Sequence, residues 1–289
     1  MAHDFVMARD GTAIAYRVEG NPRGPTLVFT SGYTASDFYW RRIAPLLAPH
    51  ARLVFWDLRG HGASAPARDL SDVSIAGCVD DLRRVMDAVQ AERAVQVAFS
   101  LGCQIIFEAW RHLPQRILGF VPILGTYGRP FDHLLHPKLG PQLKHVMRAV
   151  GGRAAGVGLC IGGLSYHVPL TFQLNQLGGV IGKRLKRKDM KPFYDHMRRI
   201  DGPSWSALGL AAAEHSAGDL LEQITVPALV ISGGKDSFTP GHLSEEMARR
   251  IPGAEHLHLP EAGHTGLLEE PERIAEAMLG FLRLHSVLT

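Results

Sequence analysis

The amino-acid sequence predicts an α/β fold in which a mainly parallel β-sheet is covered by helices on both faces. Short apolar segments alternate with segments of helical periodicity, which is the pattern of successive β-α-β units. Two of the apolar segments, TLVFT and LVFW, are almost continuous, as expected for strands buried on both faces. The alternation returns near the end of the 289-residue chain after a long interruption.

The first half of the chain supplies most of the expected elements. Strands separated by glycine turns are expected at about 3–11, 12–20, 25–32 and 51–60. A helix is expected over 37–50, and a second one should begin after Ser71 or Ser74, either of which could cap it, and run to about residue 90. The strand 94–100 runs directly into a helix over 101–115, and a further strand follows at 117–125.

The β-α-β pattern resumes with a strand at 226–234, a helix at 240–253, a strand at 254–263 and a last helix at 271–285. The intervening stretch, 127–222, breaks this pattern and contains the Gly-rich apolar segment GGRAAGVGLCIGGLSYHVPL and the basic run KRLKRKDMK. We expect it to be a helical insertion over one edge of the sheet. The predicted domains are therefore a core of 1–126 and 223–289 and an inserted helical cap of 127–222.

Composition narrows the class of protein. Hydrophobic residues make up 46% and charged residues 20%, and the formal net charge of +3 argues against a nucleic-acid partner. Cys78, Cys103 and Cys160 are widely spaced and form no zinc-binding pattern, which is typical of a reducing compartment. The N-terminus has no secretory pattern and no apolar run reaches the length of a bilayer span, so the sequence predicts a cytoplasmic protein.

Ser100 is the candidate nucleophile. It ends a predicted strand and precedes a predicted helix, within VAFSLGC, and a turn this sharp accepts only small residues two positions before and after the serine. Ala98 and Gly102 are both small, although Ala98 stands where the G-x-S-x-G pattern has glycine. The start of the helix directs free N–H groups, including that of Leu101, toward any negative charge that forms near Ser100.

A serine hydroxyl needs a base and an orienting acid to act as a nucleophile. His264 lies in the Gly-flanked loop after the strand 254–263, and Asp236 lies in the loop after the preceding strand. Because the carboxyl ends of parallel strands meet at one edge of a sheet, we expect Ser100, Asp236 and His264 to meet there. Taken singly, each has a simpler interpretation, as a buried serine, a helix cap and a loop histidine.

Serine, acid and histidine in this chain order resemble the α/β-hydrolase superfamily. Further landmarks are DLRGHGASAP from Asp57, ITVPALVISGGKDSFTP around the acid and EAGHTGLLEEPE around the histidine. The resemblance covers nearly the whole chain and implies an α/β-hydrolase fold with an eight-stranded, mainly parallel sheet and a cap. It also implies that no metal or organic cofactor is needed.

The oxyanion hole departs from the family pattern. Most relatives have His-Gly at the end of the third strand, whereas this chain has Ser31 and Gly32. Since the donor required is a main-chain group, the N–H groups of Tyr33 and Leu101 remain the expected oxyanion hole. Ser31, Gly32 and Phe99 are the expected substrate-binding residues.

Hydrolysis of a carboxylic ester or lactone through an acyl-enzyme is the leading functional hypothesis, and its expected partner is a small apolar substrate. Carbon–carbon bond hydrolysis of diketone-like substrates uses the same triad and stays open, as does a non-catalytic ligand-binding homologue. Perhydrolases tend to have a proline that SGYTAS lacks, and dehalogenases and epoxide hydrolases need aspartate at position 100.

Three other features have structural interpretations. His61, in RGHG, is interpreted as a turn histidine rather than the base, and Cys103 as a small packing residue rather than an activated thiol. The basic run of 183–191 is interpreted as a solvated helix face, while membrane contact through the cap and a homodimer stay open as alternatives.

Overall fold

The computed structural model describes residues 2–133 and 139–288. The strands are β1 (Asp4–Met7), β2 (Ala13–Gly20), β3 (Thr26–Thr30), β4 (Arg52–Trp56), β5 (Ala94–Phe99), β6 (Ile117–Ile123), β7 (Leu229–Gly233) and β8 (Glu255–Leu259). They form one sheet in the order β1-β2-β4-β3-β5-β6-β7-β8. The pairs β1/β2 and β2/β4 are antiparallel and the others parallel, which confirms the predicted mainly parallel, eight-stranded sheet.

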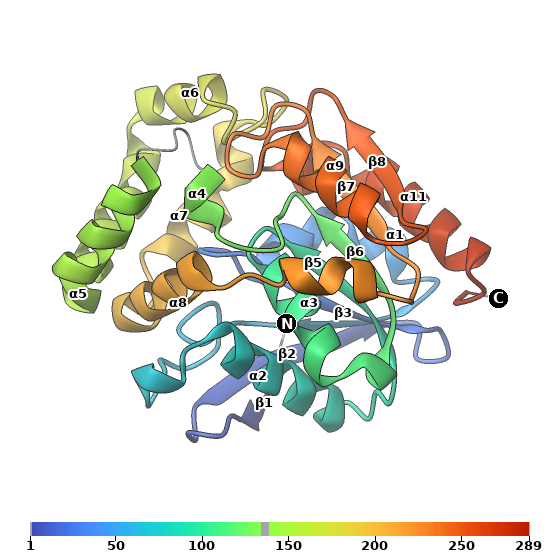
Figure 1. Ribbon diagram of the computed structural model, residues 1–289. Helices are drawn as coiled ribbons and strands as arrows, with labels where there is room; N and C mark the ends of the chain where they lie inside the picture. The colour runs from blue at the N-terminus through green and yellow to red at the C-terminus, as the bar shows by residue number, and fades with distance from the viewer. Residues whose placement is uncertain (1, 134–138, 289) are drawn as a thin grey trace.

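Helices α1 to α3 and α9 to α11 surround the sheet, and α4 to α8 stand over one side of it (Figure 1). Their bounds are α1 (Ala44–Leu47), α2 (Ile75–Ala88), α3 (Gly102–His112), α4 (Pro130–His133), α5 (Leu139–Leu164), α6 (Pro169–Leu177), α7 (Lys191–Met197), α8 (Gly202–Glu214), α9 (Gly241–Arg250), α10 (Gly266–Glu269) and α11 (Pro271–Leu284). We call α4 to α8, which lie between β6 and β7, the inserted helices. No single helix of the described residues is long and apolar enough to cross a bilayer, although two pieces, Gly151–His167 and Pro169–Leu177, bent by 100°, pass that test together.

The central strands are mostly apolar because their side chains enter two different cores, and Gln96 of β5 is a buried polar exception. In β3, Leu27 and Phe29 point into one core and Val28 into the other. Residues of α1 and α11 complete the first core, and residues of α2 and α3 complete the second. Side chains alternate between the faces of a strand, so a strand covered on both sides has no solvent-facing position to favour polar residues.

The first two helices of the structure differ in detail from those predicted. The helix expected over 37–50 is divided into a 3₁₀ helix, Asp37–Arg42, and the short α1. Pro45 explains the division, because it has no N–H to donate and its ring crowds the carbonyl four residues earlier. The next helix, α2, is capped by Ser74, whose Oγ accepts the Gly77 N–H at 2.9 Å, and not by Ser71.

Candidate active site

Ser100 lies at the sharp turn between β5 and α3. Its backbone has a φ of +55°, in the left-handed region that non-glycine residues rarely adopt. The Ser100 N–H donates to the Ile123 carbonyl at 3.0 Å, and the Cys103 N–H donates to the Ser100 carbonyl at 3.0 Å. These bonds hold the strained residue in place, with its side chain beyond the end of the sheet.

The space around this turn explains why small residues surround Ser100. A Cβ on Gly102 would lie 2.5 Å from the Thr30 carbonyl oxygen, and one on Gly125 would lie 2.6 Å from the Ser100 carbonyl oxygen. Ala98 is fully buried in β5 and its methyl group is accommodated in the core. Alanine therefore meets the requirement for smallness at this position, whereas Gly102 cannot be enlarged without moving β3.

His264 reaches Ser100 from the loop after β8. Its Nε2 lies 3.0 Å from Ser100 Oγ, and its Nδ1 lies 2.9 Å from Asp236 Oδ2. The rings of Phe99 and Phe238 lie 5.0 and 5.1 Å from the imidazole and hold it between them. The structure thus brings together the three side chains that the sequence pointed to, on loops that follow β5, β7 and β8.

Asp236 is a fully satisfied buried carboxylate. Oδ1 accepts the N–H groups of Phe238 and Thr239 at 2.8 and 2.9 Å, and Oδ2 accepts the Thr239 hydroxyl at 2.7 Å in addition to His264. Hydrogen bonds that reach both oxygens of a carboxylate fix its orientation. Thr239 is a site residue that sequence reasoning missed, although a threonine three residues after an aspartate in a turn is the signal for such an arrangement.

Tyr33 and Leu101, whose main-chain N–H groups are the expected oxyanion hole, line the same cavity as Ser100. Within residues 2–133 and 139–288, neither the Tyr33 N–H nor the Leu101 N–H donates to another protein group. Leu101 immediately precedes α3, where the first N–H groups have no partner within the helix. Both groups are therefore available to an oxygen atom bound next to Ser100.

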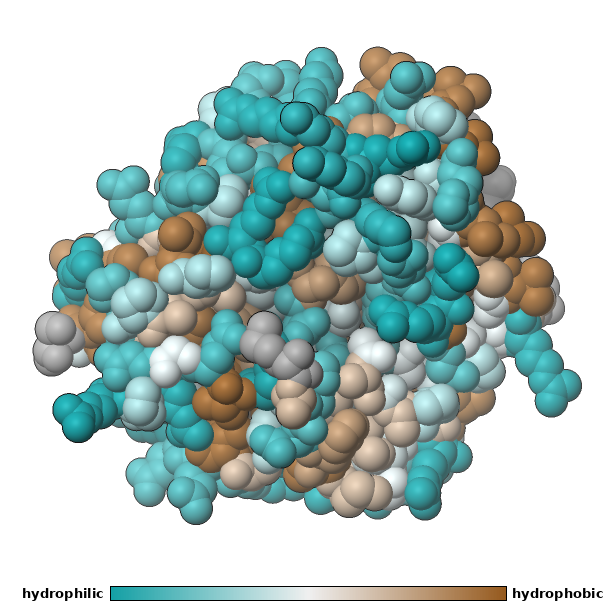
Figure 2. Space-filling model, turned by 180° about the vertical axis from the view of Figure 1, so that it is seen from behind, coloured by the Kyte–Doolittle hydropathy of each residue, from teal (hydrophilic) through white to brown (hydrophobic). Residues whose placement is uncertain are grey.

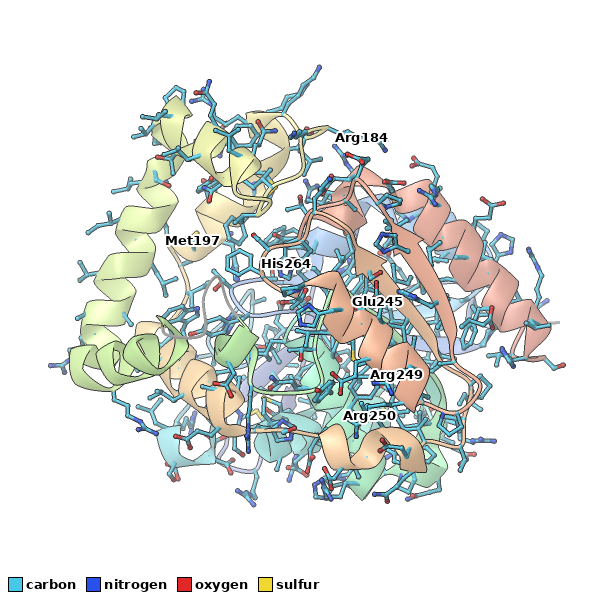
Figure 3. All side chains as sticks on the ribbon, turned by 45° about the horizontal axis from the view of Figure 1, so that its top comes forward. Arg184, Met197, Glu245, Arg249, Arg250 and His264 are labelled. Atoms are coloured by element: carbon cyan, nitrogen blue, oxygen red, sulfur yellow. The ribbon has the colours of Figure 1, made fainter. Side chains whose placement is uncertain are left out.

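A cavity of about 470 Å³ opens onto Ser100 between the sheet and the inserted helices. Figure 3 shows Met197, from α7, on the side of this space opposite His264. Most of the lining is aromatic or aliphatic and includes Tyr39, Phe99, Leu159, Val180, Ile181, Met190, Phe193, Tyr194, Met197, Trp205 and Phe238. Apolar cavities with a few polar groups at one end are typical of small-molecule sites.

Tyr33 ties the loop after β3 to the inserted helices. Its ring stacks on Trp205 of α8 with centroids 4.6 Å apart, and its hydroxyl donates to the Trp205 carbonyl at 3.0 Å. Burial raises the pKa of Tyr33 well above its usual value, so the phenol stays protonated. Trp205 in turn donates to Thr34 Oγ1 at 2.9 Å, and Thr34 has a φ of +63°.

Residues 179–182 pass between the acid loop and the histidine loop. The His264 N–H donates to the Gly179 carbonyl at 3.3 Å, and the Gly182 N–H donates to Thr265 Oγ1 at 2.9 Å. Gly179 has a φ of +72°, and a Cβ there would overlap the Lys235 carbonyl. A short piece of the inserted region is thereby attached directly to the backbone of the histidine.

The expected substrate-binding residues have different environments. Phe99 lines the cavity, but Ser31 and Gly32 are not among its lining residues. Ser31 is buried, and its hydroxyl accepts the Trp40 indole N–H at 3.0 Å, while Gly32 packs so closely on Ser100 that a Cβ would lie 2.8 Å from the serine Cβ. Ser31 therefore packs against Trp40 and does not line the cavity, where a substrate-binding residue was expected.

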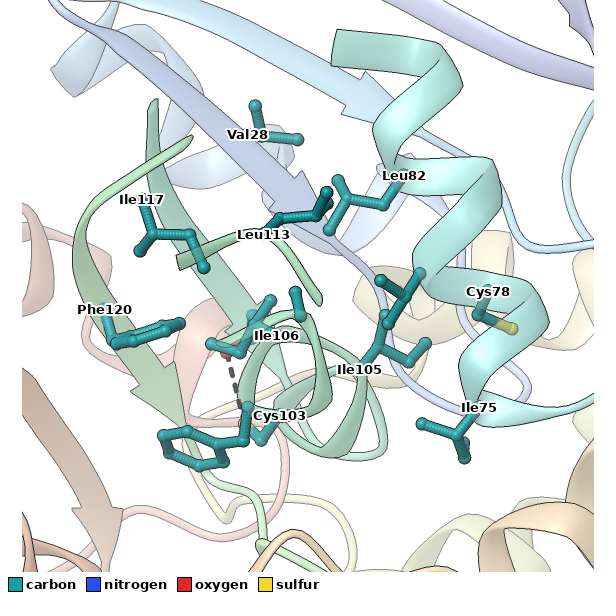
Figure 4. Packing of buried hydrophobic residues seen from close by; sticks show 14 of the residues in the cluster. Val28, Ile75, Cys78, Leu82, Cys103, Ile105, Ile106, Leu113, Ile117 and Phe120 are labelled. Atoms are coloured by element: carbon teal, nitrogen blue, oxygen red, sulfur yellow. Dashed lines mark hydrogen bonds between the residues drawn. The ribbon is translucent and has the colours of Figure 1, made fainter. Parts of the chain in front are cut away.

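His61 and Cys103 have the structural roles expected for them. His61 is buried, its Nδ1 donates to the Arg59 carbonyl at 2.9 Å, and burial lowers its pKa to about 4. Figure 4 shows Cys103 packed among apolar side chains, and burial raises the pKa of its thiol to about 12. In the described part of the chain there is no group of three or more His, Cys, Asp or Glu residues that could hold a metal ion.

A mainly parallel sheet with a serine at a strand-to-helix turn on its carboxyl edge defines the α/β-hydrolase fold. The comparison with protein families agrees, because the model described as "Alpha/beta hydrolase family" matches residues 27–277. The chain belongs to this family.

Relatives in this family have diverse descriptions. A dihydrolipoyllysine-residue acetyltransferase component of an acetoin cleaving system from Pseudomonas putida is 27% identical over 267 residues, which cover 92% of this chain and 65% of that protein. A haloalkane dehalogenase from Mesorhizobium japonicum is 32% identical over 280 residues, covering 92% and 86%. The chain also spans only 49% of the length of a Mycobacterium tuberculosis relative described as a probable oxidoreductase.

Among solved structures, the enol-lactonase from Burkholderia xenovorans LB400 matches with a TM-score of 0.75 and 20% identity, covering 97% of this chain and all (100%) of that one. At this identity the likeness shows the shared fold.

Proposed function

We propose that this protein is a serine hydrolase that cleaves an apolar carboxylic ester or lactone through an acyl-enzyme intermediate. The observation that carries the proposal is the separation of 3.0 Å between Ser100 Oγ and His264 Nε2, with Asp236 on the opposite ring nitrogen at 2.9 Å. This is the arrangement of a nucleophile, its base and the group that orients the base. Position 100 is serine, which separates the chain from the aspartate chemistry expected of a dehalogenase.

In the first half of the reaction, Ser100 Oγ attacks the substrate carbonyl carbon and its proton passes to His264 Nε2. Asp236 accepts the Nδ1–H and stabilises the resulting imidazolium. The N–H groups of Tyr33 and Leu101 donate to the oxyanion of the tetrahedral intermediate. Collapse of this intermediate breaks the ester C–O bond, and the leaving alkoxide oxygen takes the proton from His264.

In the second half, His264 removes a proton from water, whose oxygen attacks the acyl carbon on Ser100. The second tetrahedral intermediate expels Ser100 Oγ, which recovers its proton from His264, and the carboxylic acid leaves. The apolar cavity favours substrates with an acyl chain or ring, because the lining offers few hydrogen-bonding groups to a polar one.

A screen of p-nitrophenyl esters of increasing acyl length, lactones and diketones tests the proposal. Ser100→Ala should lower kcat/KM for the preferred ester by at least about 10³-fold. Undiminished turnover in Ser100→Ala would overturn the mechanism, and turnover of diketones alone would indicate carbon–carbon bond hydrolysis.

Ser232 offers a matched control. Its hydroxyl also contacts histidines, with His256 Nε2 at 2.8 Å and His258 Nδ1 at 2.9 Å, but it lies within β7 and is not among the residues lining the cavity. Ser232→Ala should retain turnover. A fluorophosphonate should label the wild type and Ser232→Ala at Ser100, and the absence of labelling would indicate a ligand-binding protein without catalysis.

A further inference from the structure

The outer surfaces of α5 and α6 expose large apolar side chains. We call Val157, Ile161, Leu164, Val168, Leu170, Leu174 and Leu177 the apolar outer face; each is between 48% and 79% exposed. The residues on α5 and α6 follow spacings of three and four, so each helix presents them along one side. Figure 2 shows brown side chains gathered at its upper right and right edge, where these two helices lie in the reversed view.

The solvent-facing sides of α5 and α6 differ in composition from those of an ordinary surface helix. The opposite sides of the same helices line the cavity through Leu159, Gly162 and Asn175. A helix that covers a cavity normally has charged and polar residues on its solvent side, whereas no Asp, Glu, Lys or Arg occurs between Ala154 and Gly182. Contiguous exposed apolar surface on a folded protein marks an interaction site.

Positive charge lies next to the apolar outer face. The exposed cations in the segment after α6 are Lys183, Arg184, Lys186, Arg187 and Lys188. The Arg187 guanidinium lies 5.2 Å from the centre of the Tyr166 ring and donates to the Tyr166 carbonyl at 3.4 Å, at the corner between α5 and α6. The basic run therefore contacts the corner between α5 and α6, whose residue Tyr166 lies between Leu164 and Val168 of the apolar outer face in the sequence.

Some of these cations lack a protein counter-charge. Arg184 lies 3.5 Å from Glu270, but within residues 2–133 and 139–288 the side chains of Lys183, Lys186 and Lys188 form no ion pair. Asp189 is engaged by Arg42 at 2.9 Å. Three ammonium groups thus remain available to an external anion.

We propose that the apolar outer face docks on an anionic lipid bilayer, with its aliphatic side chains in the interface and Lys183, Lys186 and Lys188 against lipid phosphates. Apolar side chains beside unpaired cations are the combination that binds such a surface. A second copy of the chain fits less well, because the segment from Ala154 to Gly182 that it would present has no Asp or Glu to pair with the three lysines. When the protein is docked in this way, the helices that line the cavity lie on the membrane. Apolar molecules then have a short route from the bilayer to Ser100.

Co-sedimentation of the intact protein with vesicles tests this proposal, independently of any activity. Vesicles of phosphatidylcholine mixed with phosphatidylglycerol should retain the protein at low ionic strength, and phosphatidylcholine alone should retain much less. High salt should weaken the retention because it screens the lysines. Failure of the mixed vesicles to retain the wild type at low salt would overturn the proposal.

Two sets of variants locate the surface. We expect two variants to bind the mixed vesicles about tenfold or more weakly than the wild type. One is the double variant Leu174→Ser/Leu177→Ser, and the other is the triple variant Lys183→Gln/Lys186→Gln/Lys188→Gln. Leu284→Ser on α11 is the control for the leucine variant, and Arg23→Gln/Arg93→Gln/Arg249→Gln is the control for the lysine variant. Both controls alter exposed residues elsewhere and should bind vesicles as the wild type does. Thermal unfolding of every variant checks that the fold is retained.

Equal binding by these variants and the wild type would place the contact elsewhere and contradict the proposal. Sedimentation velocity shows whether the protein forms a dimer. A dimer that is lost in Leu174→Ser/Leu177→Ser, without vesicle binding by the wild type, would show that a second copy covers this face and would also overturn the proposal.

Discussion

Gly102 offers a quantitative test of the turn that carries Ser100. In Gly102→Ala the new methyl would lie 2.5 Å from the Thr30 carbonyl oxygen and 2.9 Å from the Ser31 carbonyl oxygen. Both contacts are with backbone at the end of β3, in the middle of the sheet, so no flexible side chain can yield. A displacement of about 1 Å is needed to reach an ordinary van der Waals separation.

The expected magnitudes follow from this displacement. Overpacking costs about 1–3 kcal/mol, and the better helix propensity of alanine offsets up to about 1 kcal/mol. We expect a net loss of about 1–2 kcal/mol in the free energy of unfolding and, for a chain of this length, a fall of about 2–4 °C in Tm. A misplacement of about 1 Å at Ser100 should also lower kcat/KM roughly 100-fold.

Gly280→Ala is the matched control, because a Cβ at this position in α11 has no atom within 4 Å. This variant should gain about 0.5–1 kcal/mol from helix propensity and keep its kcat/KM. Thermal unfolding and ester hydrolysis of both variants are the measurements. Wild-type stability and turnover in Gly102→Ala would refute the steric account of the turn.

Three further outcomes are expected. Thr239→Val removes one hydrogen bond from the Asp236 carboxylate and should lower kcat about tenfold with little change in KM, whereas Thr239→Ser should restore it. Burial lowers the pKa of His196 to about 3, so the unfolded chain binds the extra proton and stability should fall as pH drops below about 6.5. His196→Gln should remove roughly 2 kcal/mol of that loss between pH 6.5 and pH 4.5 in denaturant titrations, and an identical pH dependence in both proteins would contradict this. Cys160 is the only one of the three cysteines that is exposed, so a disulfide reagent should titrate one thiol in the native protein and three after denaturation; three fast native thiols would contradict the burial of the other two.

The sequence was most informative where burial and local geometry act together. Residues 26–30 and 52–56 could be predicted as strands because covering on both faces demands apolar side chains at every position. Ser100, Asp236 and His264 could be predicted to meet because the carboxyl ends of parallel strands share one edge.

Contacts between segments that are far apart in the chain could not be predicted from the sequence. Trp205 stacks on Tyr33 across 172 positions, and nothing in either local sequence specifies that pairing. Ser31 was expected to bind substrate because of its place after β3, whereas its hydroxyl accepts the indole N–H of Trp40. The Tyr33–Trp205 contact depends on how the inserted helices pack on the sheet, and the Ser31–Trp40 contact depends on how the 3₁₀ helix Asp37–Arg42 packs against the end of β3.

The attachment of residues 179–182 to the histidine loop divides the inserted region into parts with different freedom to vary. Replacement of Gly179 or Gly182 would press a side chain against Lys235 or Glu269 and displace the backbone that positions His264. Among the described residues, α5 forms no such bond to His264, whereas the Asn175 and Gln176 carbonyls of α6 accept N–H groups of residues 179–181. The residues of α5 can therefore change, or the whole helix be exchanged between homologues, while Ser100 and its partners stay in register. New specificities should be sought by recombining α5 around an unchanged α6 and Gly179–Gly182 junction.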